Sequence, residues 1–143
     1  MRLKTALEVM ALSMVFTASV AVADDVCWQK ADPALGALRT WSDLHAWNKN
    51  YPKCDDGYFA EGLSEFVVAS FAKRWETLHL LEAEIIADNK FEEFVLKHID
   101  STTDGDDLAV VIRNAKTKCP ATLGAFCKRI AEKARMALKE IEE

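Results

Sequence analysis

The stretch FAEGLSEFVVASFAKRW, residues 59–75, decides the fold class of this chain. Its apolar residues recur at spacings of three and four, which places them on one face of an α-helix. Gly62 costs about 1 kcal/mol against alanine inside a helix, so we expect it to mark close backbone packing. The members of the face are Phe59, Leu63, Phe66, Val67, Ser70, Phe71 and Trp75.

The stretches on both sides repeat the helical pattern. Asp32-Pro33 is typical of a helix start, and Tyr51-Pro52 of a helix end. Between them apolar residues recur every third position, and Ser42 could restart the helix. Trp41, Trp47 and Trp75 fall on apolar stripes, so we expect them in the core. Further helical patterns cover residues 76–87, 91–99, 108–118 and 123–141. The sequence therefore predicts an all-α, single compact domain of about five or six helices over residues 24–143.

The first 23 residues have the parts of a bacterial signal peptide. Arg2 and Lys4 form a cationic start, a short apolar run follows, and Ala21-Val22-Ala23 supplies the small residues before a cleavage site. The apolar run is shorter than the roughly 20 residues that span a bilayer. We therefore expect residues 1–23 to be cleaved, leaving no stable membrane anchor. The expected location is the periplasm, with an extracellular protein as the alternative.

The four cysteines all follow the predicted signal peptide. An even number of cysteines in an exported chain favours disulfides. Three connectivities are open, and we favour Cys27–Cys54 and Cys119–Cys127 because each pair flanks a single turn or helix. Zinc or haem would need C-x₂-C or C-x-x-C-H spacing, which this chain lacks, so we expect neither a metal nor another cofactor.

The charge of the chain and its lack of catalytic motifs argue against two classes of function, nucleic-acid binding and enzyme activity. The chain has 18 basic and 23 acidic side chains, a formal charge of −5, which argues against binding nucleic acid. It contains no G-x-S-x-G elbow, P-loop or dinucleotide fingerprint. His79 follows Glu76 at helical spacing, but a di-iron bundle needs two such pairs. His45 is more typical of a packed residue, and His98 beside Asp100 is unspecific. We therefore expect no catalytic residue and no enzyme activity.

The polar loop from Asp100 to Asp107 partly resembles a calcium-binding loop. Asp100, Asp104 and Gly105 fit positions 1, 5 and 6 of an EF-hand. Position 12 is Val111 instead of a bidentate glutamate, so the coordination sphere stays incomplete. We expect a capping box in which Thr103 caps the next helix and Asp106 reaches back, with weak calcium binding left open.

The segment YPKCDDGY, residues 51–58, is the candidate binding interface. It combines a proline turn, a cysteine, two acids and two tyrosines, and amphipathic aromatics on a rigid loop suit a protein interface. The alternative is a stapled corner whose acids only cap a helix. The candidate interface residues are Tyr51, Asp55, Asp56 and Tyr58.

These features favour binding over chemistry. An acidic surface complements the basic enzymes that act on anionic peptidoglycan. We therefore expect a non-enzymatic periplasmic protein-binding module, an immunity or inhibitor protein against a cell-wall-directed enzyme toxin. One alternative is a periplasmic chaperone or assembly factor, which would expose apolar surface as its carboxylates protonate. A small-ligand carrier is the second. The sequence leaves open the partner's identity and the oligomeric state, a homodimer included.

Overall fold

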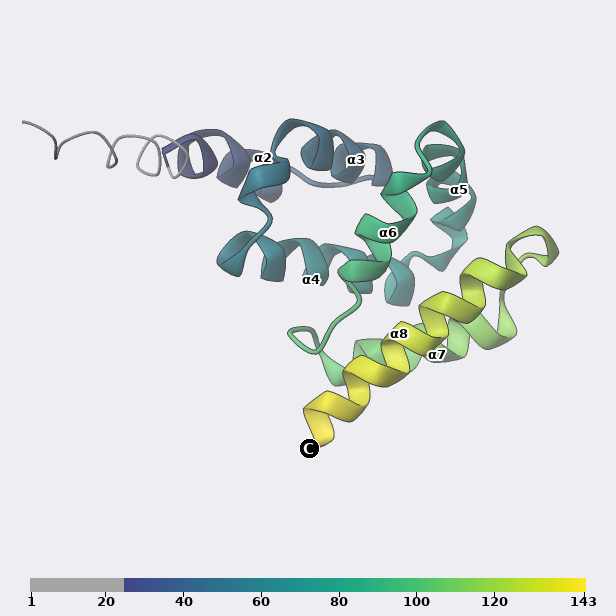
Figure 1. Cartoon of the computed structure of the whole chain (residues 1–143). Coiled ribbons are helices and arrows are strands. Elements are labelled where there is room, and N and C mark those ends of the chain that lie inside the picture. The colour runs from purple at the N-terminus through teal and green to yellow at the C-terminus, as the bar shows by residue number, and fades with distance from the viewer. Residues whose placement is uncertain (1–24) are drawn as a thin grey trace, which may run out of the picture.

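The computed structural model describes residues 25–143, which form seven α-helices and no strand (Figure 1). The expected all-α fold is therefore confirmed, while the predicted signal peptide, residues 1–23, lies outside the described residues. The α-helices are α2 (Asp32–Gly36), α3 (Trp41–Asn50), α4 (Gly57–Lys73), α5 (Leu78–Ala87), α6 (Lys90–Lys97), α7 (Gly105–Thr117) and α8 (Gly124–Glu142). A π-helical turn, η1 (Cys27–Ala31), precedes α2, and three 3₁₀-helical turns lie between later helices: η2 (Pro52–Cys54), η3 (Trp75–Thr77) and η4 (Ala121–Leu123).

Two interruptions raise the helix number above the expected five or six. Thr40 Oγ1 accepts a hydrogen bond from the Asp43 amide at 3.1 Å, while the Asp43 carboxylate accepts one from the Thr40 amide at 2.9 Å. This capping box starts α3 at Trp41, one residue before the expected restart. The long stretch that begins at Gly57 also breaks after Lys73, where η3 separates α4 from α5.

Helix α4 lies between the other elements (Figure 1). On one side are α2 and α3, on the other is the hairpin of α7 and α8, α5 lies at one end, and α6 runs from α5 back across toward the start of α7. The two hairpin helices pack most extensively on each other, and α7 also packs on α4. Between α2 and α4, Gly62 is the close-contact position. A Cβ there would lie 2.8 Å from Leu35 Cδ2. The expected close packing therefore exists, with a side chain as the neighbour.

The three tryptophans expected in the core are buried there. Burial of an indole ring is favourable only when its N–H finds an acceptor. Each of these N–H groups donates a hydrogen bond of 3.0 Å, Trp41 to Thr77 Oγ1, Trp47 to the Ala31 carbonyl and Trp75 to the Lys118 carbonyl. The tryptophans thus join elements that are distant in sequence.

Both favoured disulfides are present. Cys27–Cys54 joins η1 to η2, and Cys119–Cys127 joins the segment after α7 to α8. Disulfides persist in oxidising compartments, so this pairing indicates a protein outside the cytoplasm. Among residues 25–143, no helix combines the length and the apolar character needed to cross a membrane.

Candidate functional site

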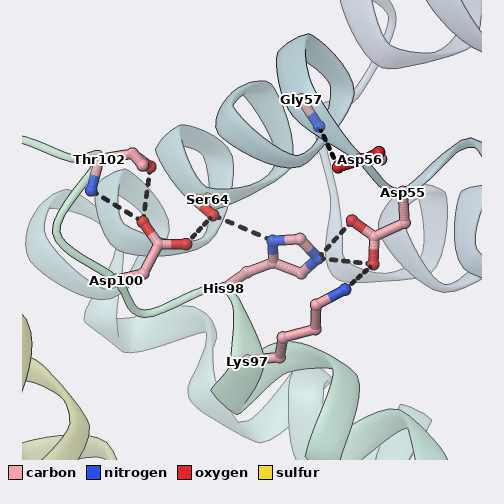
Figure 2. Close-up of polar contacts among 8 residues, drawn as sticks. All are labelled: Asp55, Asp56, Gly57, Ser64, Lys97, His98, Asp100 and Thr102. Carbon is pink, nitrogen blue, oxygen red and sulfur yellow. Dashed lines mark hydrogen bonds and ion pairs between the residues drawn. The ribbon is translucent and has the colours of Figure 1, made fainter.

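A buried chain of polar side chains connects α4 with the segments that follow η2 and α6 (Figure 2). His98, directly after α6, is 1 % exposed and Ser64 on α4 is fully buried. His98 Nδ1 lies 3.0 Å from Ser64 Oγ, and Nε2 lies 3.3 Å from Asp55 Oδ2. The Asp55 Oδ1 atom is 3.2 Å from Nε2 but has no hydrogen-bond geometry. We call Asp55, Ser64, His98 and Asp100 the polar network.

The oxygen atoms of the polar network surround the His98 ring. The Ser64 hydroxyl donates to Asp100 Oδ2 at 2.7 Å, so its oxygen accepts from His98 Nδ1. Nε2 faces the carboxylate of Asp55, which only accepts. Both ring nitrogens of His98 therefore face an oxygen partner, Ser64 on one side and Asp55 on the other.

A Ser–His–Asp chain is also the arrangement of nucleophilic hydrolases. A catalytic serine must reach its substrate and give its proton to the histidine. Ser64 is fully buried, and its proton points to Asp100 instead of His98. Ser64, His98 and Asp55 instead connect α4 with the segments after α6 and η2, and Ser64 presents no exposed hydroxyl for nucleophilic attack.

The aspartates of the polar network have pKa values below their ordinary range. Burial would raise the pKa of Asp55, but hydrogen bonds from His98 and Lys97 outweigh it and lower the pKa. The Lys97 Nζ atom lies 2.6 Å from Asp55 Oδ2. Burial likewise opposes the lowering of the Asp100 pKa, which hydrogen bonds from Ser64 and Thr102 bring about.

Replacing Asp55 with asparagine is expected to destabilise the protein less at acid pH than at pH 7. A lowered pKa in the folded state means that the ionised Asp55 stabilises the fold above the unfolded pKa of about 4. This contribution is lost as pH falls through the folded pKa. Urea unfolding of wild type and Asp55→Asn at pH 7, 4 and 3 measures the difference between them. A difference that stays constant or widens toward pH 3 would contradict the prediction.

A second buried histidine also lies between carboxylates. His45 on α3 has Nδ1 2.7 Å from Glu84 Oε2 and Nε2 3.2 Å from Asp88 Oδ2. Its ring stacks on Phe91 at 4.4 Å. The hydrogen bond from His45 lowers the pKa of Asp88. His45 is therefore packed, as the sequence indicates, and it ties α3 to the end of α5.

An open groove of about 1330 Å³ runs along α4 between α2 and the start of α7. Six carboxylates line it against one lysine, Lys73, whose Nζ lies 2.9 Å from Asp107 Oδ2. The strongly unequal charge gives this groove a negative potential that favours cationic partners. We call it the acidic groove. Its carboxylates are Asp32, Glu61, Glu65, Asp104, Asp106 and Asp107.

The structure separates the four predicted interface residues. Tyr58 is 56 % exposed and lines the acidic groove. Asp56 is exposed and caps α4, since its Oδ1 accepts from the Gly57 amide at 2.8 Å (Figure 2). Asp55 belongs to the polar network, and Tyr51 packs its ring on Trp47. Only Asp56 thus caps a helix as the alternative expects, Asp55 and Tyr51 turn toward other side chains, and Tyr58 is the one of the four with an exposed ring in the groove.

The loop before α7 differs from its predicted cap. Asp104 caps the helix in place of Thr103, because its charged Oδ1 accepts from the amides of Asp106 and Asp107 at 2.9 and 3.0 Å. The Thr103 hydroxyl instead donates to the Asp100 carbonyl at 2.8 Å. Within the described part of the chain, no group of three or more His, Cys, Asp and Glu side chains is arranged to hold a metal ion.

Sequence reasoning missed both the polar network and the groove. The signal for the network was weak but present, since Ser64 interrupts the inward face of α4 next to Leu63 and Val67. A buried polar residue needs partners, but His98 and Asp100 lie 34 and 36 residues further along the sequence, so no local pattern pairs them with Ser64. The groove carried no local signal because its carboxylates come from three separate segments.

No protein family, no curated protein and no solved structure matches this chain.

Proposed function

We propose that this chain is a non-enzymatic protein-binding module of the periplasm, an inhibitor or immunity protein that covers a basic, cell-wall-directed enzyme. The observation that carries the proposal is the acidic groove, whose six carboxylates face one lysine. Enzymes that act on anionic peptidoglycan attract their substrate with basic residues, which the groove complements.

The walls of the acidic groove are rigid, which suits a recognition surface as well as its charge does. The disulfide Cys27–Cys54 fixes the residues before α2, and the Ser64–Asp100 hydrogen bond fixes the loop that leads to α7. Both walls are therefore held in place before a partner arrives, which lowers the entropic cost of binding.

Neutralising the groove is expected to weaken partner binding by about tenfold or more, mostly through slower association. The variant is Glu61→Gln/Glu65→Gln/Asp106→Asn, whose side chains take part in no ion pair among residues 25–143. The oxidised protein, expressed from the full sequence, captures its partner from a periplasmic extract. Association rates are then measured for the captured enzyme, together with inhibition of its activity on peptidoglycan.

The matched control changes three acids that lie outside the groove lining and form no ion pair among residues 25–143: Glu76→Gln/Glu82→Gln/Glu132→Gln. It alters the net charge equally, so a loss confined to the groove variant assigns binding to the groove. Equal losses in both variants, or a captured enzyme that stays fully active, would contradict the proposal. Many weakly held clients would favour the chaperone alternative.

A further inference from the structure

An exposed aromatic pair lies at the α2 end of the acidic groove. Trp28 on η1 is 57 % exposed, and its ring stacks on Tyr58 with 5.4 Å between centroids and 29° between planes. The other three tryptophans of the chain are buried. Large aromatic surfaces left together in water are unfavourable for a monomer and mark interaction sites.

The pair is held rigidly from both sides. Trp28 directly follows Cys27, whose disulfide to Cys54 fixes η1 beside the start of α4. Tyr58 follows Gly57, whose φ of 48° lies in the left-handed region that glycine adopts without strain. Trp28 also packs on the buried Phe59 at 5.1 Å. The aromatic faces are therefore positioned before any partner binds.

The Asp32 carboxylate lies in the groove beside the aromatic pair. Asp32 lines the groove together with Tyr58, and interaction with the Asp32 carboxylate raises the pKa of the Tyr58 hydroxyl. Glu61 and Glu65 follow along α4 within the same groove. The only lysine of the groove lining is paired with Asp107. A cation that reaches the rings thus meets negative charge without a competing basic residue from the lining.

We propose that Trp28, Tyr58 and Asp32 form an aromatic shelf that binds an arginine side chain of the basic partner. A guanidinium stacks on an aromatic face while its edge donates to a carboxylate, and the shelf offers both surfaces. A lysine ammonium is more strongly hydrated and gains less from stacking. The inference rests on the proposed function only in taking a basic protein as the partner.

Calorimetric titration with hexa-arginine and hexalysine peptides of equal charge, at 150 mM salt, tests the shelf directly. Wild type is expected to bind hexa-arginine about tenfold more tightly than hexalysine. Trp28→Ala should remove this preference, whereas Trp28→Phe keeps an aromatic face and should retain it. Ile86→Ala, at an apolar residue of α5 that is 79 % exposed, is the control and should leave it unchanged.

Equal affinities for the two peptides, no binding of either, or a preference that survives Trp28→Ala would overturn the shelf. These outcomes are distinguishable from failure of the proposed function. If an enzyme is captured and inhibited but Trp28→Ala binds it normally, the proposed function is supported and the aromatic shelf is refuted. If the arginine preference is lost in Trp28→Ala while no enzyme is inhibited, the aromatic shelf is supported and the inhibitor function is refuted.

Discussion

Removing the Cys27–Cys54 disulfide, by Cys27→Ser and Cys54→Ser together, is expected to lower the free energy of unfolding by about 3–4 kcal/mol. The bridge closes a sequence separation of 27 residues, so its loss returns considerable freedom to the unfolded chain. It also frees η1 from η2, and with them the two residues next to the cysteines, Trp28 and Asp55. Urea unfolding without reductant measures the effect.

The second disulfide provides the comparison. Cys119–Cys127 closes a separation of only 8 residues, and the same chain-entropy relation gives about 2.5 kcal/mol for its loss. We therefore expect the Cys119→Ser/Cys127→Ser variant to be the more stable of the two. The opposite order, or a change below about 1 kcal/mol for the longer loop, would contradict the prediction.

Replacing His98 with alanine is expected to cost about 3 kcal/mol of stability. The substitution leaves the buried Asp55 carboxylate without its histidine partner and removes a hydrogen-bond partner from Ser64. Leaving a buried polar group without its hydrogen-bond partner costs about 1–3 kcal/mol, and we expect the upper end because both Asp55 and Ser64 lose a partner, although Lys97 still pairs with Asp55. Thermal or urea unfolding at pH 7 measures the loss.

A control and a double-mutant cycle separate this effect from lost packing. His79 is exposed and its ring bonds only to the Glu76 carbonyl, so His79→Ala should change stability by less than about 0.5 kcal/mol. Single and double variants at His98 and Asp55 should be non-additive by about 1 kcal/mol or more, because they share one interaction. Additive effects would show that His98 contributes only through packing, for instance against Phe94.

The role of Asp56 could be predicted from the sequence, whereas the role of its neighbour Asp55 could not. Asp56 caps α4 through its own backbone neighbour, and such a contact over one residue is predictable from local propensity. Asp55, its neighbour in sequence, turns inward to His98, which is 43 residues away. Nothing in the segment YPKCDDGY distinguishes the two acids, because the difference depends on the end of α6, whose His98 and Lys97 contact Asp55 but not Asp56.

The sequence alone determined the all-α class, the core tryptophans and the favoured disulfide pairing. The class and the tryptophans follow from short-range physics, because apolar residues repeat with the helical period. The pairing was favoured because it joins cysteines that are close in sequence, although two helices, α2 and α3, lie between Cys27 and Cys54. Only the tertiary structure decided that Ser64, His98 and Asp55 meet, that six carboxylates line one groove, and that Trp28 stacks on Tyr58. Each of these contacts joins residues from separate segments, and helix periodicity sets which face a residue occupies but not which helix lies opposite it.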